Sequence, residues 1–275
     1  MFLFCACKNG DEKFFKYLIK HGAKINEENK YGKTPLLITC ENGNESFVKY
    51  LVKQGALINQ DNKNGNTSLL IACENGNEFI VKYLVEQGAI INKENKDGKT
   101  PLLVACKNGN ESIVKNLVEQ GALINQDDKE GNTSLLIACE RNNESLVKYL
   151  VEHGALIIQA NKKGRTPLLV VCEKENEKLL KYLIKHGGNI NDVEINDGET
   201  PLFEVCKTGN ENFMKCLIEY GVDVNKERKL FNESPLFIAC KNENENIVRC
   251  LINNGADINK ENDFYGNLII LRLSK

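Results

Sequence analysis

The strongest constraint on the fold is a motif that recurs along most of the chain with a period of about 33 residues. The glycine of its G-x-T segment stands at Gly32, Gly65, Gly98, Gly131 and Gly164. A fixed period of this size is typical of a solenoid, in which each repeat buries its apolar side against its neighbours. The sequence therefore predicts an array of small repeated units, and the length of 275 residues does not set a number of globular domains.

One copy of the motif, residues 95–127, indicates what each unit forms. Lys96-Asp97-Gly98 is a turn sequence, and Thr100-Pro101 is typical of an N-cap followed by the first residue of a helix. The apolar residues that follow predict a short helix. Asn110 is placed to cap a second helix with an apolar stripe at helical spacing, and Gly121 is placed to end it. Each unit is therefore predicted to be a helix–turn–helix with a protruding turn.

Charged residues follow the same register on the second predicted helix. Each of these helices opens with a glutamate, and a lysine or arginine stands four residues later, as with Glu111 and Lys115. An acid near the helix N-terminus, paired with a base at this spacing, stabilises a helix by a few tenths of a kcal/mol. We expect this face to be solvated rather than a binding surface.

The eleven cysteines also follow the repeat. Eight of them occupy one position of the motif: Cys7, Cys40, Cys73, Cys106, Cys139, Cys172, Cys206 and Cys240. Equivalent residues of stacked helices lie roughly 8–10 Å apart, whereas a disulfide needs Cα atoms within about 7 Å. No Cys-x-x-Cys pair indicates a zinc site. We expect these eight residues to be small buried apolar groups of a reducing compartment.

Composition excludes several classes of partner. The net charge of -2 gives no general attraction to nucleic acid or to anionic membranes. No apolar run approaches the roughly 20 residues of a membrane-spanning helix, and no basic residues precede the apolar start, as they do in signal peptides. We therefore expect a cytoplasmic, intracellular location and a monomer, with neither a nucleic acid nor a membrane as a partner.

The motif as a whole resembles the ankyrin repeat. T-P-L-x-x-A/C is followed by N-G-N and then by I-V-K-x-L-V-x-x-G-A-x-I-N. The resemblance implies an all-α solenoid of stacked helix–turn–helix units with protruding β-turn or hairpin fingers, forming one domain over residues 1–275. The histidine that usually follows T-P-L in the family is leucine or phenylalanine here, as at Leu103. The repeats align at 1–28, 29–61, 62–94, 95–127, 128–160, 161–194, 195–228 and 229–262, with a partial capping unit at 263–275.

Catalytic and cofactor motifs are not expected from these residues. Gly98-Lys99-Thr100 ends like a phosphate-binding loop, but Lys93 replaces the glycine that the loop needs five residues earlier. The three histidines, His21, His153 and His186, each precede the glycine that ends a second helix, where a histidine interacts with the last carbonyls. We therefore predict no catalytic residue, no cofactor and no metal ion.

Ankyrin arrays grip partner proteins with a concave face made of the fingers and the exposed side of each first helix, so the resemblance implies a binding face here. Its predicted members are Lys30, Tyr31, Lys33, Lys63, Asn64, Asn66, Lys96, Asp97, Lys99, Lys107, Asn108, Lys129, Glu130, Arg141, Lys162, Lys163 and Arg165. We refer to five of them, Lys30, Lys63, Lys96, Lys129 and Lys162, as the basic row. We hypothesise that the basic row receives an acidic segment of a partner, mainly speeding association. The alternative is that acids of neighbouring fingers, Asp61, Glu94 and Asp127, neutralise it.

Two sets of apolar residues depart from the family pattern. Leu57, Ile90, Leu123 and Leu156 follow the G-A segment, and Ile158 stands near them where other repeats have asparagine. We favour packing of the first four on one another, with partner contact as the alternative. The second set occupies late fingers, where aromatic residues favour contact with a partner. Its members are Leu230, Phe231, Phe264 and Tyr265.

Three classes of function are open from the sequence alone. The first is a non-catalytic scaffold that binds another protein. The second is a structural spacer, which predicts uniform fingers, and the variation among Lys96-Asp97, Asn196-Asp197 and Leu230-Phe231 counts mildly against it. The third is a regulatory repeat region of a larger protein that includes an enzyme.

Overall fold

Each repeat of the sequence forms a pair of short α-helices joined by a tight turn. The computed structural model describes residues 2–191, 200–228 and 232–260. Within these ranges it contains sixteen helices and no strand. The predicted all-α repeat fold is therefore confirmed.

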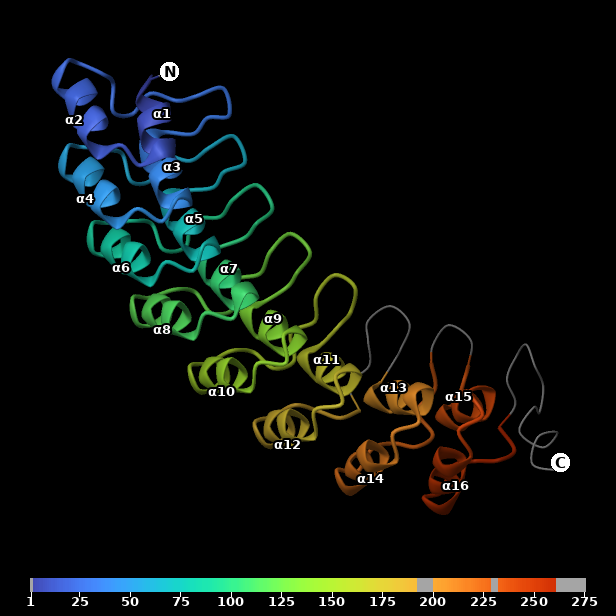
Figure 1. Ribbon diagram of the computed structural model, residues 1–275. Helices are drawn as coiled ribbons and strands as arrows, with labels where there is room; N and C mark the ends of the chain where they lie inside the picture. The colour runs from blue at the N-terminus through green and yellow to red at the C-terminus, as the bar shows by residue number, and fades with distance from the viewer. Residues whose placement is uncertain (1, 192–199, 229–231, 261–275) are drawn as a thin grey trace. The chain divides into compact units, whose positions relative to one another are not determined.

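The first of two compact units spans Met1–Lys129. Its helices are α1 (Phe2–Asn9), α2 (Glu12–Lys20), α3 (Pro35–Glu41), α4 (Glu45–Lys53), α5 (Ser68–Glu74), α6 (Glu78–Glu86), α7 (Pro101–Asn108) and α8 (Glu111–Glu119). Within this unit, each odd-numbered helix packs on the even-numbered helix of its own repeat, and α1, α3, α5 and α7 pack on one another in succession. The unit therefore has two layers of helices, and the finger loops extend beyond the odd-numbered layer (Figure 1).

The second compact unit spans Glu130–Lys275 and repeats this plan. Its helices are α9 (Ser134–Glu140), α10 (Glu144–Glu152), α11 (Pro167–Glu173), α12 (Glu177–Lys185), α13 (Pro201–Thr208), α14 (Glu211–Glu219), α15 (Pro235–Lys241) and α16 (Glu245–Asn253). The same neighbours pack together, such as α9 with α10 and α11. Whether the two units act as one domain, as the sequence predicts, stays a prediction.

The helices begin where the sequence places their caps. The hydroxyl of Thr100 accepts a hydrogen bond from the N–H of Leu103 at 3.3 Å, and Pro101 is the first helical residue. Asn110 caps α8 in the same way, accepting from the N–H of Ile113 at 3.1 Å. These bonds satisfy N–H groups that have no partner within the helix. The predicted caps of this repeat are confirmed.

The core lies between the two layers of each unit. In the fourth repeat, for example, α8 buries Ile113, Val114 and Leu117, which form the predicted apolar stripe. Each fully buried side chain of this size contributes roughly 1.5–3 kcal/mol. Since every repeat is too small to bury these residues alone, the neighbouring repeats stabilise one another.

The cysteine ladder is buried, as predicted. The eight equivalent cysteines are each at most 5% exposed. Burial raises the pKa of Cys7 and that of Cys40 to about 12, because an apolar environment disfavours the thiolate. These side chains therefore pack as neutral thiols at neutral pH.

A set of asparagines joins each repeat to the next, a contact that the sequence did not reveal. Asn92 shows the arrangement. Its Nδ2 donates to the carbonyl of Gly121 at 3.3 Å, and its Oδ1 accepts from the N–H of Leu123 at 2.9 Å. We call this paired contact the asparagine clamp. The other described clamps belong to Asn26, Asn59, Asn191 and Asn225.

Candidate functional site

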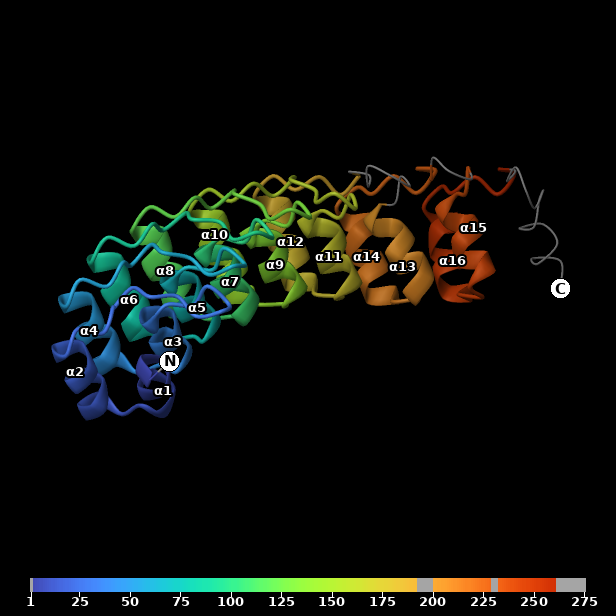
Figure 2. The ribbon, with the colours of Figure 1, turned by 90° about the horizontal axis from the view of Figure 1, so that it is seen from above.

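The fingers carry most of the residues that the sequence assigned to a binding face. In the fingers at Gly32, Gly65, Gly98 and Gly164, a β-turn is closed by a backbone bond such as that from the N–H of Gly98 to the carbonyl of Asn95, at 3.0 Å. The finger loops run along one edge of each unit (Figure 2). The side chains at their tips are therefore presented to solvent by a loop of fixed geometry.

Backbone bonds hold four of the basic-row lysines, Lys63, Lys96, Lys129 and Lys162, against the finger before each of them. The N–H of Lys96 donates to the carbonyl of Asn64 at 2.9 Å, and the N–H of Lys129 donates to the carbonyl of Asp97 at 3.0 Å. The turn glycine allows this approach: a Cβ on Gly98 would lie 2.8 Å from the nitrogen of Lys129. The fingers of a unit therefore form a bonded series, with one exposed lysine at each step.

All five members of the basic row are exposed. Lys30 lies over the ring of Tyr31, with its ammonium 4.9 Å from the ring centroid. Within residues 2–191, no ion pair involves a basic-row lysine. The positive charge of the basic row is therefore available to a partner.

Two of the three acids that could have neutralised the basic row, Asp61 and Glu94, have other contacts. Asp61 pairs with Lys93, with Oδ2 and Nζ 3.6 Å apart. Glu94 accepts a hydrogen bond from the amide of Gln126. Neither acid contacts a basic-row lysine, so the contacts favour the hypothesis of an available basic row over the neutralised alternative.

The cations beside the basic row are paired within the chain. Lys33 Nζ lies 2.6 Å from Glu41 Oε1, and Lys99 Nζ lies 3.4 Å from Asp97 Oδ2.

Arg165 bonds to Glu140 at 2.8 Å and also to Glu173. Partial burial lowers the pKa of Arg165, but the two carboxylates outweigh this effect and hold the pKa above its ordinary value. Arg165 thus joins two odd-numbered helices of the second unit and stays charged.

Several other predicted site residues have structural contacts. Asn108 donates to the carbonyls of Cys73 and Glu74, at 3.2 and 2.8 Å, and so joins α7 to α5. Asn66 accepts a hydrogen bond from the side chain of Asn95 at 2.8 Å. These asparagines stabilise the stack in addition to lining its face.

The structure describes some of the remaining predicted site residues but not the others. Asn64, Lys107, Glu130, Arg141 and Lys163 are exposed. The late-finger residues lie outside the described residues: Leu230, Phe231, Phe264 and Tyr265.

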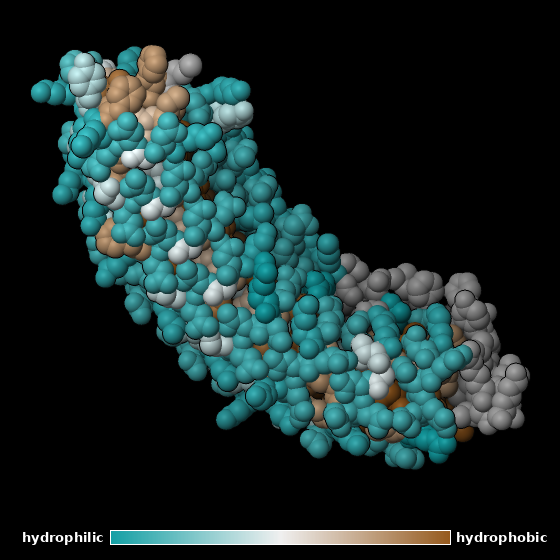
Figure 3. Space-filling view, in the orientation of Figure 1, coloured by the Kyte–Doolittle hydropathy of each residue, from teal (hydrophilic) through white to brown (hydrophobic). Residues whose placement is uncertain are grey.

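A groove at the start of the first unit brings together residues that the sequence did not connect. It has a volume of about 710 Å³ and lies between α1, the first finger and α3. Phe4 and Lys8 of α1 line it together with Tyr31 and Lys33. Tyr31, in the first finger, is 58% exposed. Figure 3 shows apolar residues gathered over the first helices on an otherwise hydrophilic face.

The row of aliphatic residues after G-A is exposed, and the packing of these side chains on one another stays a prediction. Leu57, Ile90 and Leu123 of the first unit are 57%, 51% and 58% exposed, and Leu156 of the second is 52% exposed. The asparagine clamp fixes the backbone N–H of Leu57, Ile90 and Leu123.

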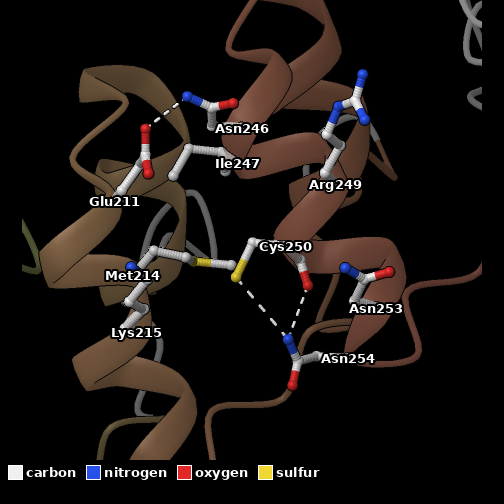
Figure 4. Close-up of a pocket in the computed structure, with 9 residues that line it drawn as sticks. All are labelled: Glu211, Met214, Lys215, Asn246, Ile247, Arg249, Cys250, Asn253 and Asn254. Carbon is white, nitrogen blue, oxygen red and sulfur yellow. Dashed lines mark hydrogen bonds between the residues drawn. The ribbon is translucent and has the colours of Figure 1, made fainter.

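A pocket lies between α14 and α16. It has a volume of about 320 Å³, and Lys215, Arg249 and Cys250 line it (Figure 4). Burial raises the pKa of Cys250, and Lys215 only partly offsets this. Catalytic cysteines instead have a lowered pKa and an adjacent base. The pocket therefore lacks the features of a nucleophilic site.

The histidines have the capping role that the sequence predicts. Nδ1 of His21, His153 and His186 lies 2.7–2.8 Å from the carbonyl four residues earlier. Each ring also stacks on the tyrosine at that position, with centroids 4.0–4.1 Å apart. The part of the chain that the structure describes contains no cluster of three His, Cys, Asp or Glu residues suited to a metal ion.

Comparisons with known proteins support the interpretation that the chain is an array of ankyrin repeats. A family model that describes three consecutive ankyrin repeats matches the chain in overlapping ranges: residues 3–95, 56–128, 88–160, 123–194, 156–227 and 188–262. A search of curated proteins finds no match. None of the helices in the described ranges is both long enough and apolar enough to cross a bilayer.

Proposed function

Because the chain belongs to the ankyrin-repeat family, whose repeats are generally protein–protein interaction modules, we propose that it is a non-catalytic scaffold that binds a partner protein through its fingers and odd-numbered helices. The partner presents an acidic segment to the basic row. One observation carries the proposal: the basic-row lysines are exposed and have no acidic partner in the described part of the chain.

The backbone geometry supports this role. Lys63, Lys96 and Lys129 are held by bonds to the preceding finger, so a partner orders only their side chains. Exposed ion pairs contribute little affinity, about 0–1 kcal/mol each. A row of like charges instead steers a complementary partner and raises the association rate, an effect that salt weakens.

The test compares charge reversals on two faces of the first unit. The finger variant is Lys96→Glu with Lys129→Glu, and the matched outer-face variant is Lys49→Glu with Lys82→Glu on α4 and α6. Each purified full chain captures proteins from an extract of the source cells, and mass spectrometry quantifies them. We expect a protein that wild type and the outer-face variant retain and that the finger variant loses by about ten-fold, equivalent to about 1.4 kcal/mol.

Equal recovery of every captured protein by all three chains would refute the binding face. Salt gives a second check on the acidic segment. The association rate of the captured partner should fall as ionic strength rises, because the Debye length shortens to about 8 Å at physiological salt. A rate that does not respond to salt would contradict the acidic segment.

A further inference from the structure

A charged pair recurs at the base of the fingers. The residue after the turn glycine and the residue eight positions later lie together, the second at the end of the odd-numbered helix. In the second repeat these are Lys33 and Glu41, whose charged atoms are 2.6 Å apart. The sixth repeat pairs Arg165 with Glu173.

The eighth repeat reverses the order. Glu233 follows the turn and Lys241 stands eight residues later, with Oε1 and Nζ 3.7 Å apart. In these three repeats the two positions therefore carry opposite charges and contact each other. We call this arrangement the finger-base pair.

The fourth repeat has two cations at these positions, Lys99 and Lys107. No other repeat that the structure describes at both positions has two cations there. The third repeat has Asn66 with Glu74, and the fifth has Asn132 with Glu140. Because neither position of the fourth repeat carries a carboxylate, these two residues cannot form a finger-base pair with each other.

The charges around these two lysines leave an excess of positive charge. Lys99 Nζ reaches back to Asp97 Oδ2 at 3.4 Å, and the side chain of Asp97 is 69% exposed. Lys107 is exposed at the end of α7 and makes no ion pair within the described ranges. Lys96 adds a cation, and Glu74 of α5, on which α7 packs, adds an acid. This set of residues therefore has three cations and two acids.

We propose that Lys99 and Lys107 receive a carboxylate of the bound partner, in the place that Glu41 and Glu173 occupy in their own repeats. This assignment rests on the proposed function and names the position where the acidic segment docks. Lys99 has a side chain 36% exposed, close to the 31% of Lys33 and of Arg165. A carboxylate here is therefore partly shielded from water, and it fixes the register of the partner along the fingers.

The test uses a hexaglutamate peptide as the probe and the full chain labelled with nitrogen-15. We expect the largest amide shifts in the fourth repeat, at Lys99 and Lys107, when the peptide is titrated. Lys107→Glu should weaken binding by about five-fold, since the new carboxylate occupies the site and forms a finger-base pair with Lys99. The matched variant Lys82→Glu on α6 has the same change in net charge and should retain more than half of the affinity.

A second variant tests whether the carboxylate of Asp97 competes with the peptide for Lys99. Asp97→Asn removes the carboxylate that Lys99 now contacts, so we expect it to bind the peptide about twice as tightly. Lys107→Glu should also keep the melting temperature of wild type or raise it, which separates loss of the site from loss of the fold.

The outcomes are distinct from those of the capture experiment. Absence of peptide binding, equal weakening by Lys107→Glu and Lys82→Glu, or largest shifts at Lys63 would each overturn the site in the fourth repeat. If the finger variant still loses its captured protein, the proposed function stands without this site. If that variant also behaves as wild type, both proposals fail.

Discussion

The close approach of neighbouring fingers can be tested by adding one methyl group. In Gly98→Ala the new Cβ would lie 2.8 Å from the backbone nitrogen of Lys129. Atoms cannot remain at that distance, so the two fingers must separate. Separation breaks the bond from the N–H of Lys129 to the carbonyl of Asp97, which is 3.0 Å long.

The matched control is Gly121→Ala in the same repeat. Both glycines have a left-handed backbone, with φ of +78° at Gly98 and +90° at Gly121, but no atom lies within 4 Å of a Cβ added at Gly121. In either variant the left-handed alanine costs about 1–2 kcal/mol, and the less flexible unfolded chain offsets about 0.4–1 kcal/mol. The control should therefore lose about 0–1.6 kcal/mol.

Gly98→Ala should lose more, because the broken bond adds about 0.5–1.5 kcal/mol. We expect a difference of about 1 kcal/mol between the variants. The measurement is urea unfolding followed by far-ultraviolet circular dichroism, with equal slopes required before the free energies of unfolding are compared. Equal losses would show that the fingers do not restrain each other.

Three further changes test the fold. Asn92→Ala removes both bonds of one asparagine clamp and should lower the free energy of unfolding by about 1–3 kcal/mol; a loss below 0.3 kcal/mol, about the limit of such comparisons, would count against the clamp. Thr100→Ala should cost about 1 kcal/mol, while Thr200→Ala should cost less, since Thr200 makes no side-chain cap bond; equal costs would contradict the role of the cap. Burial raises the pKa of Cys40 from 9.0 to about 12, so the neutral thiol stabilises the fold fully below pH 9 and this contribution falls as pH rises toward 12. The urea midpoint should drop between pH 8 and pH 10, and Cys40→Ala should drop less than wild type.

The sequence predicted the features that depend on a single repeat. Thr100, Asn110 and the buried cysteines follow from helix caps and apolar periodicity, which act over a few residues. His21 could be placed at a helix end because the glycine that ends the helix follows it directly. These features are local, so the printed residues were sufficient.

Contacts between repeats were harder to predict. Asn92 reaches residues about 30 positions later in the next repeat, and only the stacking geometry brings them together. The exposure of Leu123 was not predicted, because spacing in the sequence does not show how the clamp holds the backbone at this position. The groove beside Tyr31 was missed for a similar reason, since α1 lines it from another repeat.

The asparagine clamp has a consequence for how such a chain can change in length. In the described clamps, the asparagine provides one donor and one acceptor, and the next repeat presents a glycine carbonyl and a backbone N–H in return. Inserting or deleting a complete repeat that carries this asparagine therefore regenerates an equivalent junction, whereas Ile158 of the fifth repeat has no amide to form one. Losing a fraction of a repeat would leave unmatched partners at the cut, so duplication and loss should proceed in whole modules.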